Sequence, residues 1–172
     1  VKMLEKMYQK RLQGYASMGY MAKGEDAPSA PMDVIFHRDN FLPVFLGDIA
    51  GAKKEILIVS PFVRKRRSVK MIDHLKNAVE NNVRTIALTR PADDFNSENK
   101  ASLESIFELF ESKGIKVVFK PKIHQKFAIV DRKTVWYGSI NLLSYGTSQE
   151  SIMRIESANI ANELIKSLGS RV

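Results

Sequence analysis

The residues with the clearest capacity for chemistry lie in two short segments of the second half of the chain. The first is His124-Gln125-Lys126, and the second is Gly138-Ser139-Ile140-Asn141. A tight polar turn at 131–133 separates them, so they are expected on the two strands of a β-hairpin. Residues two apart on a strand face the same side, so the hairpin brings an imidazole, an ammonium, a hydroxyl and an amide together.

This set of side chains suits phosphodiester chemistry. A neutral imidazole, here His124, can attack phosphorus and form a covalent intermediate. Lys126 and Asn141 can then neutralise and hydrogen-bond the non-bridging oxygens as charge builds up on them. A second imidazole would be needed to protonate the leaving oxygen. No metal or other cofactor is expected, because the sequence supplies no obvious cluster of carboxylates and histidines.

An isolated His-x-Lys pair carries little information, and the chain contains a second one, His74-Leu75-Lys76. That pair falls on an expected helix and lacks the polar residues that follow Lys126. We interpret His74 as a residue of the helix surface and His37 as a loop or surface residue, with little weight on chemistry for either.

Hydrophobic periodicity predicts an α/β domain. A β-α-β-α-β pattern, typical of parallel strands, is followed by the hairpin, one more strand and a closing helix. We therefore expect a mixed β-sheet flanked by helices on both faces. The expected helices are 41–52, 69–81 with Ser68 as N-cap, 101–113 and 158–168; the expected strands are 55–60, 83–88, 115–119, 126–130, 134–137 and 151–155.

The first part of the chain differs from the rest. Residues 1–23 show the spacing of an amphipathic helix, and a Gly- and Pro-containing linker follows at 24–31. The first residue is Val1 rather than Met, so we expect the chain to be a piece of a longer protein.

The net positive charge of the chain indicates a polyanionic ligand such as a nucleic acid. The chain carries 27 Lys and Arg against 19 Asp and Glu, a net charge of +8. The candidate contacts to a phosphate backbone lie after the first predicted strand and just before His124: Arg64, Lys65, Arg66, Arg67, Lys120 and Lys122. A solvated basic surface without a polyanionic ligand is the alternative, and composition alone leaves it open.

Other features narrow the class of protein. The chain has no cysteine, which excludes disulfides, zinc-thiolate sites and thiol nucleophiles and fits a reducing, cytoplasmic setting. No apolar run is long enough to span a membrane, so no membrane partner is expected.

The aromatic residues near the motif could pack in the core or stack on bases. Strand alternation requires either Trp136 or Tyr137 to face the core. Packing is the favoured interpretation of the other ring, and Tyr145 is the better candidate for base stacking.

The spaced residues His124-x-Lys126-x4-Asp131-x6-Gly138-Ser139-x-Asn141 resemble the HKD signature of the phospholipase D superfamily. The resemblance extends over 33–168, so residues 1–32 are assigned to an N-terminal helix and linker and 33–172 to a phospholipase D-like catalytic domain. It implies a structural role for Asp131, which would anchor the turn. Gly138 lacks a side chain, which independently of the resemblance predicts the close approach of a ligand at this position. Glu150 stands where the family often has an acidic residue that hydrogen-bonds the histidine.

The resemblance also implies how the chain would work. Family members build one active site from two motifs, and this chain carries one motif. The resemblance therefore implies a two-fold homodimer, in which His124 of one subunit attacks phosphorus and His124 of the other acts as general acid and then as base. Single-motif members are mostly nucleases, which favours nucleic acid as substrate, DNA before RNA. Residues 136–150 are similar to versions fused to helicases or found in defence proteins, which implies a helicase or ATPase region as a partner. A nucleic-acid-binding module without turnover, and less favoured a phospholipid-cleaving enzyme, are the alternatives.

Overall fold

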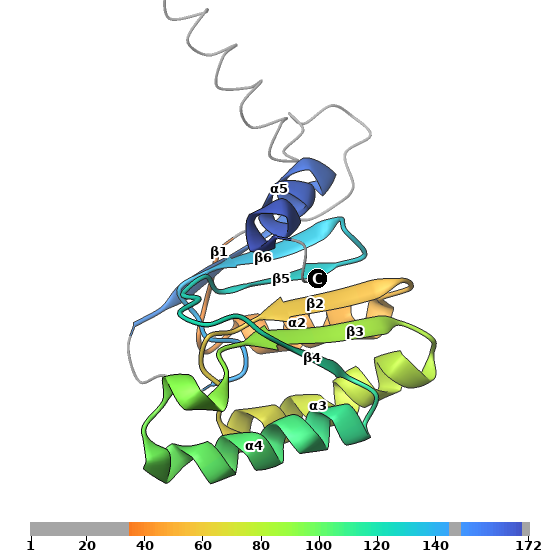
Figure 1. The fold of residues 1–172 in the computed structure, drawn as a ribbon. Helices are drawn as coiled ribbons and strands as arrows, with labels where there is room; N and C mark the ends of the chain where they lie inside the picture. Colours follow the sequence, from red (N-terminus) through yellow and green to blue (C-terminus); the bar gives the residue numbers. More distant parts are fainter. Residues whose placement is uncertain (1–34, 145–148, 170–172) are drawn as a thin grey trace, which may run out of the picture.

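A computed structural model describes residues 35–144 and 149–169, which form one seven-stranded mixed sheet with helices on both faces (Figure 1). The strand order is β1-β7-β6-β5-β2-β3-β4. The expected α/β class and mixed sheet are confirmed. The predicted helix at 1–23, the linker at 24–31 and Tyr145 lie outside the described residues.

One half of the sheet is parallel. Strands β2, β3 and β4 pair side by side in the same direction, and α3 and α4 form the two crossover connections. A short 3-10 helix, η1, precedes α4. The bounds are β2 Glu55–Val59, α3 Lys65–Glu80, β3 Arg84–Thr89, η1 Ala92–Asp94, α4 Ser97–Ser112 and β4 Lys116–Phe119.

The other half is antiparallel and contains the predicted hairpin. Strands β5 and β6 pair through Phe127↔Tyr137 and Val130↔Thr134, which confirms the hairpin, and β5 also pairs with β2. Strand β7 pairs with β6, and β1 adds the edge. The bounds are β5 Phe127–Val130, β6 Thr134–Gly138, β7 Ser151–Glu156 and β1 Ile35–His37.

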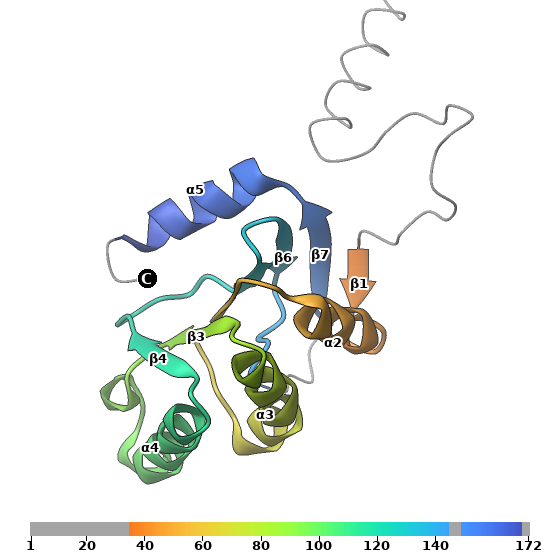
Figure 2. The same cartoon turned by 90° about the vertical axis from the view of Figure 1, so that its right-hand side faces the viewer.

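Two apolar cores lie on opposite faces of the sheet. On one face, α2 (Phe41–Gly51), α3 and α4 pack against strand residues that include Trp136. On the other face, α5 (Ala158–Leu168) packs against residues that include Phe127 and Val135. Figure 2 shows α5 on one side of the sheet and the other helices on the opposite side. The alternation along β6 buries Trp136 completely and leaves Tyr137 39% exposed.

Two helix starts and one strand differ from the sequence prediction by more than a single residue. Helix α3 begins at Lys65 rather than 69, so Ser68 is buried inside the helix and Arg64 is its N-cap. Lys and Arg favour helix well enough to form a first turn, which the charge run had obscured. Helix α4 likewise begins at Ser97 rather than 101. Strand β1 was not predicted, because three residues are too few to show a period.

A buried ion pair joins α2 to the antiparallel half of the sheet. Arg154 donates from Nε and Nη2 to the two oxygens of Asp48, at 2.7 and 2.8 Å, and Trp136 Nε1 donates to the same carboxylate at 2.7 Å. The side chains of Arg154 and Asp48 are only 8% and 16% exposed. This bidentate pair fixes the helix over Trp136.

We predict that Asp48→Ala lowers the free energy of unfolding by about 3–5 kcal/mol, because it removes the bidentate partner of a buried guanidinium and leaves the longer contact to Glu156, at 3.4 Å. Urea unfolding followed by circular dichroism measures the change. Glu163→Ala is the matched control. It breaks the Lys166–Glu163 pair, whose side chains are 73% and 72% exposed, and should cost no more than about 0.5 kcal/mol. Equal losses in the two variants would contradict this account of the pair.

Candidate active site

The two motif segments meet at one end of the hairpin. The backbone N–H of Gly138 donates to the carbonyl oxygen of Lys126 at 3.3 Å, next to the first residue pair of β5 and β6. The Lys126 Nζ donates to the carbonyl oxygen of His124 at 3.0 Å. Strand β5 begins at Phe127, so His124 and Lys126 lie in the irregular segment before it rather than on the strand itself. The imidazole of His124 is exposed.

The irregular segment before β5 is held by the side chains of Arg90 and Asp94. Arg90, just after β3, donates from Nε to the carbonyl oxygen of Ile123 at 2.8 Å. The backbone N–H of Lys122 donates to Asp94 at 2.8 Å, and Lys122 has a φ of 57°. Its left-handed backbone makes a turn here, so the strand alternation that would have put Lys122 on the same face as His124 does not apply.

Ser139 is tied to β7. Its hydroxyl accepts from the Ser151 N–H at 3.1 Å and donates to the Ser151 carbonyl oxygen at 3.3 Å. The Ser151 carbonyl oxygen also accepts the backbone N–H of Ser139 at 2.9 Å. The Ser139 hydroxyl can therefore turn towards a substrate while the Ser151 carbonyl oxygen keeps a hydrogen bond. Ser139 is exposed and lies where the hairpin ends.

Gly138 is required by the backbone of β7. A Cβ at this position would lie 2.3 Å from the Ser151 carbonyl oxygen and 2.7 Å from the Ile152 Cα. The close approach suggested by the sequence is therefore made by a neighbouring strand. The expected neighbour was a ligand, and the structure shows the backbone of β7 there instead.

We predict that Gly138→Ala costs about 2 kcal/mol or more of stability, because two backbones must move apart to admit the methyl group. Gly47→Ala is the matched control: no atom lies within 4 Å of its Cβ, and Gly47 is inside α2. An alanine there should leave stability unchanged or raise it by up to about 1 kcal/mol. Thermal unfolding of both variants compares them, and a Gly138→Ala protein as stable as the wild type would be the contrary result.

Asn141 lies in a loop that is fastened to the segment after β2. Leu143 accepts from the Arg64 N–H at 2.8 Å and donates to Ser60 Oγ at 3.2 Å. The Asn141 side-chain oxygen is buried and has no hydrogen-bond partner in the described part of the chain. The loop thus brings Asn141 to the end of the sheet where the parallel strand β2 terminates, and its amide has an unused acceptor.

The charge on Lys126 depends on its neighbours. Burial lowers the pKa of the Lys126 ammonium, the Glu150 carboxylate works in the opposite direction, and Arg90 lowers the pKa further. Glu150 therefore lies close enough to support the charged form of Lys126. Among the described residues no hydrogen bond joins Glu150 to His124, and the electrostatic effect of Glu150 falls on Lys126.

Asp131 lies at the opposite end of the hairpin. Its carboxylate accepts the backbone N–H groups of Lys53 at 2.9 Å, Lys54 at 2.7 Å and Glu55 at 2.9 Å. Burial would raise the pKa of Asp131, but these three hydrogen bonds outweigh it and lower the pKa. The carboxylate fastens the hairpin turn to the start of β2 and lies away from the segments that carry His124 and Asn141.

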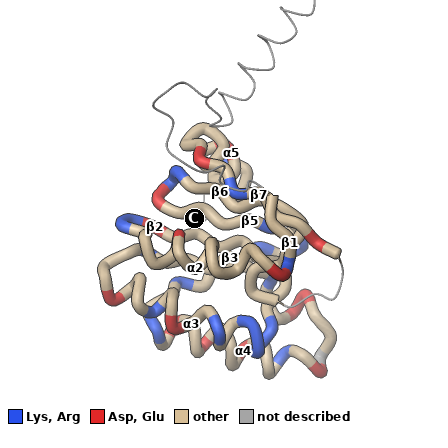
Figure 3. The backbone as a smooth tube through the Cα atoms, turned by 180° about the vertical axis from the view of Figure 1, so that it is seen from behind, with Lys and Arg blue, Asp and Glu red and all other residues tan. Residues whose placement is uncertain are grey.

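The six candidate phosphate-binding cations are not equivalent. Arg64, Lys65 and Arg66 are exposed at the start of α3, beside the loop that follows Asn141. Arg67 corrects the prediction: it is only 4% exposed, donates from Nε to the Leu142 carbonyl oxygen and lies over the Phe41 ring. It supports the Asn141 loop from inside the protein. Figure 3 shows cationic positions over several elements with acidic positions between them.

The two lysines before His124 also differ. Lys122 is exposed. Lys120 donates from Nζ to the carbonyl oxygens of Leu168 at 3.0 Å and Ser167 at 3.4 Å, at the carboxyl end of α5. A cation favours that end of a helix, so Lys120 is a helix cap and is not directed at a phosphate.

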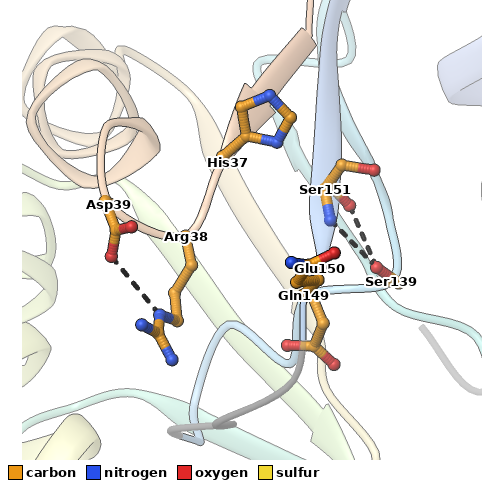
Figure 4. Close-up of a pocket in the computed structure, with 7 residues that line it drawn as sticks. All are labelled: His37, Arg38, Asp39, Ser139, Gln149, Glu150 and Ser151. Atoms are coloured by element: carbon orange, nitrogen blue, oxygen red, sulfur yellow. Dashed lines mark hydrogen bonds and ion pairs between the residues drawn. The ribbon is translucent and has the colours of Figure 1, made fainter.

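Sequence reasoning missed two residues beside this site. Arg90 holds the residue before His124 and acts on the charge of Lys126; its place at the carboxyl end of a parallel strand could have identified it. His37 lines a pocket of about 540 Å³ with Arg38, Asp39, Ser139, Gln149, Glu150 and Ser151 (Figure 4). The sequence did not indicate that His37 lies beside the motif, because the short edge strand β1 that carries it was not predicted.

The described ranges, residues 35–144 and 149–169, hold neither a cluster of metal-ligating side chains nor a helix suited to crossing a membrane. In these ranges no three or more His, Asp or Glu side chains are grouped as a metal site would require. None of the helices there combines the length and hydropathy that a membrane crossing needs.

The family described as "Cardiolipin synthase, PLD-like domain" matches residues 45–171 of the 172-residue chain. The chain belongs to this family of the phospholipase D superfamily. The resemblance drawn from the HKD signature is thereby confirmed. No curated protein matches the sequence as a relative.

Solved structures share the phospholipase D-like fold. Nuc from Salmonella typhimurium, a phospholipase D family member, is 18% identical with a TM-score of 0.61, over 80% of this chain and 91% of Nuc. NucT from Helicobacter pylori is 16% identical with a TM-score of 0.58, over 77% and 90%. The archaeal chromatin protein TrmBL2 is 14% identical with a TM-score of 0.54, over 96% of this chain and 59% of its own. At these identities the likeness concerns the fold.

Proposed function

We propose that this phospholipase D-like chain is a metal-independent nuclease that cleaves DNA, or RNA, through a covalent bond between phosphorus and His124. The position of Lys126 carries the proposal. Its Nζ lies 3.0 Å from the His124 carbonyl oxygen, and the Glu150 carboxylate favours its charged form. A cation therefore lies beside the residue that would attack phosphorus, and it can neutralise the charge that grows on the phosphate.

Each residue of the site receives a role in two steps. In the first step, an imidazole nitrogen of His124 attacks phosphorus, and the leaving oxygen takes a proton from a second imidazole. In the second step, that imidazole removes a proton from water, whose oxygen attacks phosphorus and releases His124. Lys126, Ser139 and Asn141 hold the non-bridging oxygens throughout.

We assign the second imidazole to His124 of the partner subunit in a two-fold homodimer. The chain carries one copy of the motif, and a two-fold axis near the exposed His124 would bring two copies together. Arg64, Lys65, Arg66 and Lys122 would then flank the paired site and contact the nucleic-acid backbone.

We also infer that residues 33–172 act as the catalytic domain of a longer cytoplasmic protein. The similarity of residues 136–150 to helicase-fused relatives supports a helicase or ATPase region in the same chain. Such a region would deliver nucleic acid to the site.

Two other functions have specific support. The DNA binding described for TrmBL2 favours a binding module without turnover, and the family description of a cardiolipin synthase favours phospholipid as substrate. The complete set of polar residues at the site argues against a module that has lost its chemistry. The same assay set separates the three functions.

The experiment is degradation of labelled single- and double-stranded DNA and RNA in excess EDTA, beside headgroup release from anionic vesicles. Cleavage of nucleic acid by the wild type in EDTA is the expected result. Binding of DNA without cleavage under any condition would favour the binding module, and headgroup release alone would favour the lipid enzyme. Cleavage that stops in EDTA and returns with Mg²⁺ would overturn the metal-independent proposal.

The pH dependence of cleavage should follow the neighbours of Lys126. Activity requires the ammonium, so kcat/KM should fall as pH rises through the lowered pKa of Lys126. Glu150→Gln removes the group that raises this pKa and should move the alkaline fall to lower pH. Arg90→Gln removes a like charge and should move it to higher pH. If both variants moved the alkaline fall of kcat/KM in the same direction, the assignment of this fall to Lys126 would be contradicted.

A further inference from the structure

The pocket beside the motif is built by the edge strand β1. Buried Phe36 anchors this strand against Trp136, with ring centroids 5.2 Å apart. His37 pairs with Ser151, and Ser151 exchanges hydrogen bonds with Ser139. The three residues thus form one row across β1, β7 and the end of β6, which spans about 10 Å at two strand spacings.

The walls of the pocket are polar and carry charges of both signs. Figure 4 shows Arg38 and Glu150 extending to the same side of this row, with the Arg38 Nε 3.4 Å from Asp39. The lining includes one guanidinium, one imidazole and two carboxylates, together with the amide of Gln149 and two hydroxyls. Such a mixture of donors and acceptors suits an uncharged polar group better than a second phosphate.

An exposed apolar row lies next to the polar row on the same face of the sheet. Strand pairing aligns Ile35 with Met153 and Met153 with Tyr137. These three side chains are 57%, 38% and 39% exposed, although they are large and apolar. The Tyr137 ring stacks on Phe127 at 6.3 Å with an interplanar angle of 23°, which fixes its orientation.

A nucleoside matches both rows, because it combines a flat aromatic face with a polar edge and sugar hydroxyls. We propose that this pocket and the row Ile35–Met153–Tyr137 bind the nucleoside next to the scissile phosphate, with Tyr137 stacking on the base and His37 binding its polar groups. The inference rests on the proposed nuclease function and names its recognition element. The volume of about 540 Å³ is in the range of small-ligand sites.

The test compares two phosphodiesters with the same leaving group. One is the p-nitrophenyl ester of thymidine 5′-phosphate, and the other is bis(p-nitrophenyl) phosphate, which has no nucleoside. We expect His37→Ala and Tyr137→Ala to lower the ratio of their kcat/KM values at least tenfold, through KM for the thymidine ester. Tyr137→Phe keeps the ring and should keep the ratio. His74→Ala, an exposed histidine on α3, is the control and should change neither substrate.

The outcomes distinguish the inference from the function on which it rests. Equal loss on both substrates would assign His37 to the reaction or to folding, and an unchanged ratio would exclude the subsite; either result overturns the inference. A change in dimer dissociation, measured by sedimentation, with no change in the ratio would make this face an interface instead. If the wild type cleaves neither ester, calorimetric binding of thymidine 5′-phosphate decides. Weaker binding by both alanine variants supports the subsite, and unchanged binding rejects it.

Discussion

Replacing His124 with alanine is expected to reduce cleavage of nucleic acid by a factor on the order of 10⁴, because the residue that attacks phosphorus is removed. Binding of the same nucleic acid should change little, since the imidazole is exposed and the cations around it remain. A gel assay of labelled DNA in EDTA measures the rate, and fluorescence anisotropy measures the binding.

The chain contains its own matched control for this variant. His74 begins a second His-x-Lys pair, on α3, and is exposed like His124. His74→Ala should cleave at the wild-type rate. The account of His124 fails if the two alanine variants are equally active, or if His124→Ala loses binding as completely as cleavage.

Lys126→Met is expected to lower kcat by about 10²–10³-fold, because the ammonium stabilises charge that grows on the phosphate in the transition state. The effect on KM should be smaller, since other cations also attract the substrate. Steady-state kinetics on an aryl phosphodiester separates the two parameters. Lys76→Met is the control: Lys76 pairs with Glu80 at 3.2 Å on α3 and should leave kcat unchanged.

A change confined to KM would contradict the role given to Lys126. It would mean that the ammonium attracts the substrate without acting on the transition state. The pH profiles of Glu150→Gln and Arg90→Gln provide independent evidence, because they alter the Lys126 charge without removing the ammonium.

Much of the fold could be predicted from sequence because its strongest patterns are local. The β-branched run at 55–60 and the polar turn at 131–133 predicted β2 and the hairpin, and both are confirmed. The helix predicted to end at 113 ends at Ser112, and Gly114 just beyond it has a φ of 76°, the left-handed backbone that a helix end uses. Helix α5 has the predicted bounds.

The features that sequence missed depend on tertiary contacts. Strand β1 exists because β7 offers a free edge and Phe36 fits beside Trp136, and neither fact is visible in three residues. The charge run at 64–67 indicated a surface, yet Arg67 turns inward to a carbonyl oxygen that lies 75 residues along the chain. A spacing rule has no information about such distant partners.

The candidate site was predictable where it depends on the local motif, and not where it depends on tertiary contacts. The motif predicted that the segments around Lys126 and Gly138 would meet, and the hydrogen bond between them places them together. It did not predict that Glu150 would act on Lys126, that β7 would be the neighbour that requires Gly138, or that Arg90 would hold the His124 segment. These contacts come from strands brought beside the hairpin by the fold.

The most direct test of the central claim is to trap the covalent intermediate. Wild-type protein would be mixed with a short labelled DNA in EDTA, quenched with alkali within the first turnover, and digested for mass spectrometry under basic conditions. We predict a nucleotide or phosphate group bonded to the imidazole of His124, stable in base, lost in acid and absent from His124→Ala. Cleavage that proceeds with the adduct on another residue, or with water attacking phosphorus directly and inverting a chiral phosphorothioate in one step, would contradict it.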